Sequence, residues 1–162
     1  MTRILKSSLM EQLATKLADA LAALQASTAA ASEAATHEQA KPENKYDTRG
    51  LEASYLAGAQ KERVAEMQNT LDNLRNTPLR IFGDDDPIGP TALVELDLAG
   101  ARSLCLLVRA GAGFTLEFGE RKTLTVSISS PLGKALLGKK TGDFATVATS
   151  QGDKDYEILT VW

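Results

Sequence analysis

The sequence predicts an α+β protein in which an antiparallel helical hairpin precedes a small domain built on an antiparallel β-sheet. Three observations carry this prediction. Apolar and small residues recur at alternating spacings of three and four along residues 10–34 and again along residues 50–74. A polar segment containing Pro42 separates the two patterns, and short apolar runs divided by glycine turns fill residues 91–162. We expect a coiled-coil hairpin over residues 1–76, a linker over 77–90 and the sheet domain over 91–162.

The first helix is expected to begin near residues 3–7 and to end near Ala35. A mean spacing of 3.5 residues keeps one side of a helix turned toward a partner, as in a left-handed coiled coil. The second half of this helix is almost entirely Ala, Ser and Thr, and alanine has the highest helix propensity. The expected seam consists of Met10, Leu13, Leu17, Ala20, Leu24, Ser27, Ala31 and Ala34.

The second helix is expected to use Asp47 or Thr48 as its N-cap and to end at Arg75, shortly before a proline. The two seams match in residue size only if this helix folds back on the first at residues 36–49. Small residues then lie near the turn, and Leu and Met lie at the other end. The expected seam consists of Gly50, Ala53, Ala57, Gln60, Val64, Met67, Leu71 and Leu74.

The sheet domain is predicted from its alternating and apolar runs, which give expected strands at residues 91–98, 103–108, 114–118, 124–129, 144–149 and 156–161. One short helix follows Ser130, the expected N-cap, with Pro131 at its first position and Gly138 at its end. In the linker, residues 84–86 are three aspartates, which we interpret as an acidic turn rather than a metal site. Cys105 lies in an apolar run and is expected to be a buried strand residue rather than a nucleophile.

Composition excludes several classes of protein. A net charge of −3 disfavours a DNA-binding protein held mainly by phosphate neutralisation. A single cysteine excludes an internal disulfide and fits a reducing compartment. The sequence has no apolar run of roughly 18 residues and no recognisable signal peptide, so we expect a cytoplasmic protein without a membrane span.

Two stretches together resemble the GreA/GreB family of bacterial transcription elongation factors. Residues 126–143, VSISSPLGKALLGKKTGD, are similar to the family signature of a strand, Ser-Pro, a short Leu-rich helix, Gly-Lys and Gly-Asp. The final YEILTVW fits the family's last strand, and Glu43-Asn44 matches the tip of its hairpin. The resemblance covers nearly the whole chain and implies an FKBP-like C-terminal domain joined to a coiled-coil hairpin.

The resemblance also implies RNA polymerase as the partner of a monomeric regulator. In the family, the C-terminal domain docks at the rim of the polymerase secondary channel, and the hairpin tip enters the channel toward the nascent RNA. Tip carboxylates there help hold a Mg²⁺ ion, so that the polymerase cuts its own backtracked transcript. The chain would then be no enzyme and would have no cofactor of its own. The docking residues implied are Ser129, Ser130, Pro131, Leu132 and Lys134, although a solvated helix face explains Lys134, Lys139 and Lys140 equally well.

The candidate Mg²⁺-sharing acids of the tip are Glu43, Glu38 and Asp47. Cleavage-active family members carry an Asp-x-x-Glu pair, and matching Glu43 to its Glu puts Ala40 at the Asp position. Affinity for a hard cation rises with the number of anionic oxygens, so we expect weak or no stimulation of cleavage. Helix capping is the alternative role of Asp47. The only histidine, His37, is expected to be a solvent-exposed tip residue rather than a ligand.

Other functions remain open at this point. One is a polymerase regulator without cleavage activity that competes with cleavage factors, as illustrated by the related Rnk-type regulators. Another is a structural coiled coil that dimerises through Leu51, Tyr55 and Leu56, which lie off the expected seam. A peptidyl-prolyl isomerase is disfavoured, because the few aromatic residues of the sheet domain fall mostly on alternating strand positions typical of a core.

Overall fold

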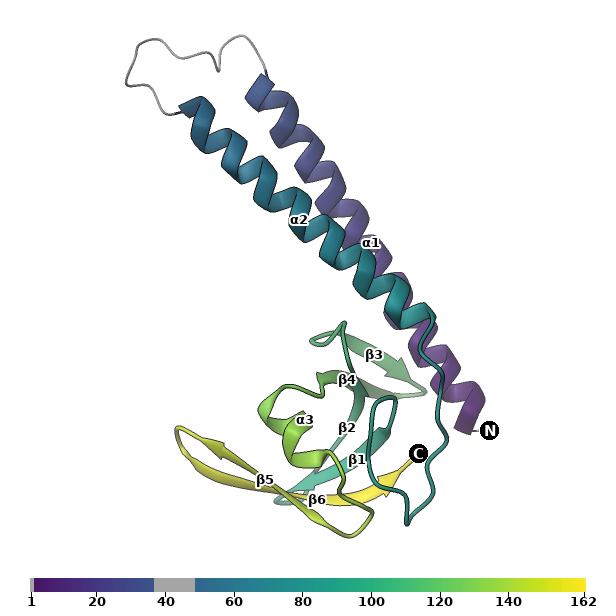
Figure 1. Cartoon of the computed structure of the whole chain (residues 1–162). Helices are drawn as coiled ribbons and strands as arrows, with labels where there is room; N and C mark the ends of the chain where they lie inside the picture. Colours follow the sequence, from purple (N-terminus) through teal and green to yellow (C-terminus); the bar gives the residue numbers. More distant parts are fainter. Residues whose placement is uncertain (1, 37–48) are drawn as a thin grey trace. The chain divides into compact units, whose positions relative to one another are not determined.

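The computed structural model describes residues 2–36 and 49–162, and its elements confirm the predicted α+β class. Two long helices, α1 (Thr2–Thr36) and α2 (Arg49–Arg75), precede a six-stranded sheet and one short helix, α3 (Pro131–Leu136) (Figure 1). The chain forms two compact units. One combines the residues up to Ala14 with residues 73–162, and the other spans Thr15–Asp72.

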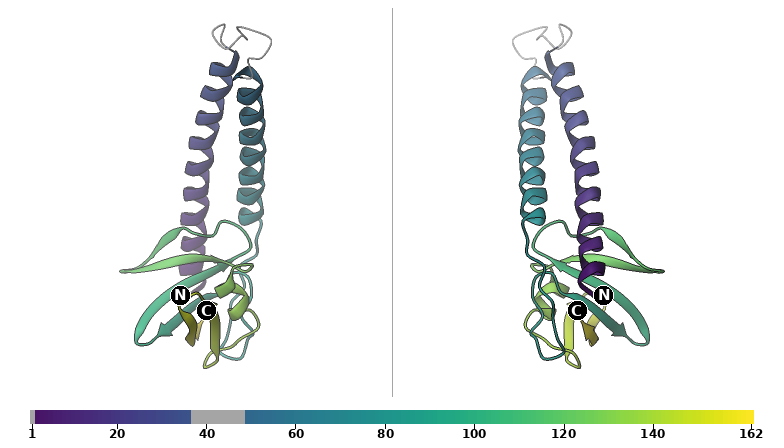
Figure 2. Two further views of the ribbon diagram at one scale, coloured as in Figure 1. Left: turned by 90° about the vertical axis from the view of Figure 1, so that its left-hand side faces the viewer. Right: turned by 90° about the vertical axis from the view of Figure 1, so that its right-hand side faces the viewer.

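In the second unit, α1 and α2 lie side by side in both views of Figure 2. The predicted seam of α2 is confirmed from Ala57 to Leu71, because the residues at the expected spacing there are all partly or fully buried; at Gly50 and Ala53, whose burial is not described, it stays a prediction. The seam of α1 departs from the prediction at two turns: Leu21 is buried where Ala20 was expected, and Thr28 is buried while Ser27 is exposed. An α-helix has 3.6 residues per turn, so a strict 3.5-residue pattern drifts around it. The Thr28 hydroxyl donates to the Leu24 carbonyl at 2.8 Å, which satisfies it in this buried position.

Three large apolar side chains on α2 lie off the seam and are exposed, namely Leu51 (57%), Tyr55 (73%) and Leu56 (57%). Of the two arrangements that the sequence allowed, a shifted seam or an exposed strip, the structure shows the exposed strip. At the other end, α2 stops at Arg75 as predicted. The Thr77 hydroxyl donates to the Asn73 carbonyl at 2.7 Å just before Pro78. No helix in the described residues is long and apolar enough to cross a membrane.

The sheet of the first unit has the strand order β3-β4-β2-β1-β6-β5. Neighbouring strands are antiparallel except β2 and β4, which pair in parallel with Leu106 opposite Thr125. The all-antiparallel sheet expected from the sequence is therefore wrong for this pair. The chain leaves β2 through residues 109–114 and forms a β3-β4 hairpin that inserts β4 beside β2. The strands are β1 (Leu93–Leu98), β2 (Ala101–Val108), β3 (Thr115–Phe118), β4 (Arg121–Ser127), β5 (Phe144–Thr149) and β6 (Gly152–Val161).

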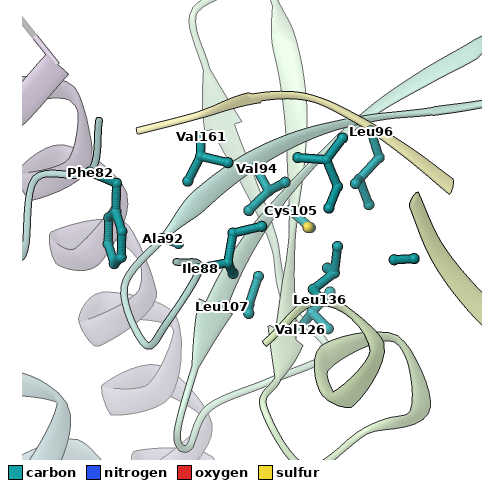
Figure 3. Packing of buried hydrophobic residues seen from close by; sticks show 12 residues of the cluster. Phe82, Ile88, Ala92, Val94, Leu96, Cys105, Leu107, Val126, Leu136 and Val161 are labelled. Carbon is teal, nitrogen blue, oxygen red and sulfur yellow. The ribbon is translucent and has the colours of Figure 1, made fainter. Parts of the chain in front are cut away.

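One face of this sheet packs against α3 and forms the main hydrophobic core (Figure 3). Leu136 of α3 is fully buried and lies close to Leu107 and Val126. Cys105 is buried in the same cluster, which confirms its predicted role as a strand core residue. Burial raises the pKa of its thiol to about 12, because the charged thiolate is poorly solvated there. The thiol is therefore protonated at neutral pH and is a poor nucleophile.

The segment predicted as a linker contributes to this core. Phe82 and Ile88 are 5% and 3% exposed, and both reach the cluster from the residues before β1 (Figure 3). The Ile88 amide donates to the Lys139 carbonyl at 2.8 Å, and the Gly138 amide donates to the Ile88 carbonyl at 2.9 Å. Residues 77–90 thus form part of the first unit instead of a separate connection. The many Pro, Gly and Asp residues of this segment are typical of a linker, but the segment also contains two apolar side chains large enough to stabilise the core by their burial.

The aspartates of this segment form a turn, as expected. Asp86 accepts a hydrogen bond from the Gly83 amide at 2.9 Å and pairs with the Arg80 guanidinium at 2.9 Å. The hydrogen bond from Gly83, together with the charge of Arg80, lowers the pKa of Asp86 below its usual value. Among the described residues, no group of three His, Cys, Asp or Glu side chains is arranged to hold a metal ion.

The beginning of α1 belongs to the first unit and protects one edge of the sheet. Leu9 and Leu13 are fully buried. The Gln12 side-chain amide donates to the Glu117 carbonyl at 3.0 Å and accepts from the Glu117 amide at 2.8 Å. Glu117 lies in the edge strand β3, so this side chain substitutes for a missing neighbouring strand at that point.

Lys6 is a buried cation in the same unit, with only 1% of its surface exposed. Its ammonium group donates to the carbonyls of Arg80 and Trp162 at 2.5 and 2.9 Å, and lies 4.9 Å from the centre of the Phe82 ring. Burial, and then the charge of Arg80, lower the pKa of Lys6 from 10.5 to about 8. Lys6 therefore joins the first helix to two distant segments by hydrogen bonds, although desolvation of its charge is unfavourable.

Stability should consequently rise with pH through the window set by Lys6. The unfolded chain keeps this proton up to about pH 10.5, whereas the folded chain releases it near pH 8. Between these values the unfolded state binds more protons, so the free energy of unfolding increases with pH, by about 3 kcal/mol in total. Urea titrations followed by Trp162 fluorescence at several pH values measure this increase. Lys6→Met should abolish it and Lys134→Met, at an exposed lysine, should retain it; equal pH dependence in all three proteins contradicts the assignment.

Candidate functional site

The candidate site within the described residues is the turn between β4 and α3, residues 127–134. Ser130 has extended backbone angles (φ −69°, ψ 161°), and its hydroxyl accepts a hydrogen bond from the Gly133 amide at 3.1 Å. The same hydroxyl donates to the Ser127 carbonyl at 2.7 Å. The structure thus confirms the predicted N-cap at Ser130 with Pro131 at the first helical position.

Gly133 is a further essential residue of this turn that the sequence reasoning missed. A Cβ atom at this position would lie 2.0 Å from the Ser127 carbonyl oxygen and 2.9 Å from the Ile128 Cα atom. Both are backbone atoms, so only glycine allows the first turn of α3 to pack this closely on the end of β4. A glycine inside a short predicted helix was the available signal, since glycine there is otherwise unfavourable.

The five predicted docking residues divide into two groups. Ser129, Pro131 and Lys134 are exposed and available to a partner. Ser130 is occupied by the N-cap hydrogen bonds, and Leu132 is partly buried against the core, so these two position the turn. The hydroxyls of Ser129 and Ser127 are 2.7 Å apart, which restrains the exposed serine as well. The turn therefore presents a small surface on a rigid backbone.

Basic side chains flank this surface. Lys134 on α3 and Lys139 and Lys140 after it are all exposed. The Lys140 amide donates to the Asp143 carboxylate at 2.8 Å, which closes the predicted turn over residues 139–143. The surface around α3 is consequently suited to a partner with acidic side chains.

The candidate acids of the hairpin tip, Glu38, Glu43 and Asp47, lie outside the described residues, as do His37 and Ala40. The structure therefore leaves their sequence-based assignment as a prediction.

Comparison with known proteins identifies the class to which this site belongs. Residues 118–162, which contain α3 and the whole turn before it, match the family model described as "Transcription elongation factor, GreA/GreB, C-term". A transcription elongation factor GreA from Rickettsia felis is 58% identical over 36 residues, 22% of this chain and 22% of that protein. The sheet domain is thus of the type found in transcription elongation factors.

Longer matches extend the likeness to the hairpin. The transcription elongation factor GreA from Methylococcus capsulatus is 31% identical over 134 residues, which cover 82% of this chain and 78% of that protein. The transcription inhibitor protein Gfh1 from Thermus aquaticus is 30% identical over 122 residues, which cover 72% of this chain and 71% of that protein. The chain belongs to the GreA/GreB family of transcription elongation factors. A solved structure of the transcription factor Gfh1 aligns over 95% of this chain and 93% of that one, at 27% identity and a TM-score of 0.41.

Proposed function

We propose that the chain binds RNA polymerase and regulates transcript elongation from the secondary channel. The sheet domain would dock at the rim of the channel, and the tip between α1 and α2 would reach toward the active site. The observation that supports this most is the match of residues 118–162 to the GreA/GreB C-terminal domain, combined with a relative over most of the chain that is an elongation factor. In this proposal the chain acts as a monomer and has no catalytic activity of its own.

The geometry of the turn at residues 127–134 supports a docking role for its exposed residues. A rigid N-capped backbone carries Ser129, Pro131 and Lys134, so little conformational entropy is lost when a partner covers them. The neighbouring Lys139 and Lys140 add positive charge, which favours association with an acidic rim and fixes its orientation. Docking through this surface should weaken as the ionic strength rises.

The tip determines whether transcript cleavage is stimulated. We propose that Glu43, with Glu38 and Asp47 nearby in the sequence, shares the weakly held Mg²⁺ ion of the polymerase and lies close to the nascent RNA. Two-metal phosphoryl chemistry requires additional anionic oxygens for such an ion. Ala40 removes one of the two carboxylates expected there, so cleavage should be weak or absent. The relatives include both an elongation factor and an inhibitor at nearly equal identity, which favours keeping a non-cleaving regulator as the second candidate.

The experiment that tests this proposal adds purified protein to stalled, backtracked elongation complexes and follows the length of the RNA. Wild type should give weak or no cleavage, because one carboxylate cannot hold the second Mg²⁺ well. Ala40→Asp should increase the cleavage rate by about tenfold or more, and Glu43→Ala introduced into that variant should abolish the gain. Strong wild-type cleavage that survives Glu43→Ala contradicts the assignment of the tip.

The same assay tests docking independently of cleavage, because a bound wild-type protein should compete with a cleavage-active factor. Lys134→Glu should weaken this competition, while Lys154→Glu, at an exposed lysine of β6, serves as the matched control with the same change in charge. Absence of competition by the wild type, or equal loss of competition in both variants, would rule out docking through α3.

A stable dimer in sedimentation equilibrium would instead favour the structural coiled coil that associates through Leu51, Tyr55 and Leu56.

A further inference from the structure

A cavity of about 570 Å³ lies in the first unit, away from the docking turn. It is bounded by the beginning of α1, the end of α2, the segment before β1 and the end of β2. Its size falls within the range of about 300 to 1,000 Å³ that is typical of small-molecule sites. No part of the proposed role in transcription requires this cavity, so its presence needs a separate explanation.

The lining of the cavity is mainly apolar. Met10, Leu74 and Val108 line it and are themselves 9%, 7% and 3% exposed, so they belong to its interior. Pro78 and Pro90 add two rigid apolar rings to the lining. Binding is favourable when an apolar molecule displaces water from such a surface. Side chains that are already fixed by packing lose little conformational entropy on binding.

Polar side chains make up the rest of the lining, namely Asn73, Asn76, Thr77, Thr91 and Arg109. Arg109 is the single charged residue of the lining, and it has no ion-pair or hydrogen-bond partner within the part of the chain that the structure describes. Asn73 also lines the cavity, is exposed and supplies a side-chain amide. A guanidinium group presents several donors in a plane and suits a carboxylate, sulfonate or phosphate group.

The backbone at this cavity is strained. Thr91 lines it with a φ angle of 70°, in the left-handed region that a β-branched residue rarely adopts. The Thr91 amide donates to the Leu107 carbonyl at 2.8 Å, and the Thr91 hydroxyl accepts from the Arg80 amide at 3.2 Å, which together maintain this conformation. Residues held in such conformations concentrate at binding sites.

We propose that this cavity is a binding site for a small molecule with an apolar body and one anionic group. The apolar body would lie against Met10, Leu74 and Val108, and the anionic group would pair with Arg109. A ligand that binds only the folded state would stabilise the first unit by mass action, which makes the site a means of regulating this chain by a metabolite.

The test uses 8-anilinonaphthalene-1-sulfonate as an apolar anion and N-phenyl-1-naphthylamine as its neutral counterpart. Both probes should bind the folded protein saturably, with enhanced fluorescence. Arg109→Gln should weaken binding of the sulfonate by about tenfold and leave the neutral probe nearly unchanged, since only the charged hydrogen bond is lost. Arg102→Gln, at an exposed arginine of β2, is the matched control and should change neither.

The position of the probe is checked separately with ¹³C-methyl methionine. The Met10 methyl resonance should shift as the sulfonate saturates the site, and the Met67 resonance, from the second unit, should remain unchanged. Ala110→Trp, which fills part of the cavity, should remove the Met10 shift in a protein whose urea unfolding is otherwise normal. Unsaturable binding, equal affinity of wild type and Arg109→Gln for the sulfonate, or equal shifts at both methionines would overturn the proposal.

Discussion

Gly133→Ala is expected to lower the free energy of unfolding of the first unit by about 3 kcal/mol or more. The new Cβ atom would lie 2.0 Å from the Ser127 carbonyl oxygen and 2.9 Å from the Ile128 Cα atom, and neither of these backbone atoms can rotate away as a flexible side chain could. Relief requires α3 to move away from β4, which also disturbs the packing of Leu136 against Val126. The Ser130 hydroxyl would then lose the amide of residue 133 as its donor.

Urea unfolding measured by Trp162 fluorescence gives the magnitude, and Gly58→Ala provides the control. Gly58 lies in α2, and a Cβ atom added there would meet no atom within 4 Å, so alanine should stabilise the helix by up to about 1 kcal/mol. The two glycine substitutions are thus expected to have opposite signs. A loss below about 1 kcal/mol for Gly133→Ala would mean that the turn at residues 127–134 is much less tightly packed than described, and that its exposed residues are not held rigidly.

Phe82→Ala is expected to cost about 3–5 kcal/mol, the range for removing a buried aromatic side chain. Phe82 is 5% exposed, and the cations of Lys6 and Arg80 lie 4.9 and 4.7 Å from its ring centre. Removing the ring therefore takes away both apolar burial and the favourable contact of two cations with an aromatic face. The buried Lys6 would also lose part of the environment that accommodates its charge.

Ile81→Ala is the matched control, because Ile81 is adjacent in sequence but 55% exposed. Its cost should stay below about 0.5 kcal/mol. Thermal unfolding of both variants, with Trp162 as the reporter, distinguishes a segment that belongs to the core from a connection between domains. A similarly small decrease in stability for both variants would show that residues 77–90 are a linker, as the sequence predicts, and not part of the core.

The positions of the helices were predictable, because they depend on interactions between residues that are close in the sequence. Helix propensity and seam spacing indicated both helices and the end of α2 at Arg75. Ser130 followed by Pro131 identified α3 from a capping preference that operates within three residues. The resemblance to the family signature in residues 126–143 identified the family, which the comparisons confirmed.

Features that depend on contacts between distant segments were not predictable in the same way. Strand pairing is not encoded within a strand, so the parallel pairing of β2 with β4 could not be inferred from two apolar runs. Phe82 was assigned to a linker because the residues around it are turn formers, and its burial depends on β1 and on Lys6. Ser27 and Thr28 differ too little in polarity for the sequence to decide which one faces α2. The cavity beside Arg109 is formed by four segments and leaves no local pattern.

The inert thiol of Cys105 has a practical consequence for studying this protein. Because its pKa is about 12 and the sulfur is enclosed by the core, maleimide reagents should leave it unmodified while the chain is folded. A cysteine introduced at a surface position can then be labelled selectively without first replacing the native one. Fluorophores or cross-linkers attached within residues 37–48 would test the proposed binding of that segment in the secondary channel of RNA polymerase.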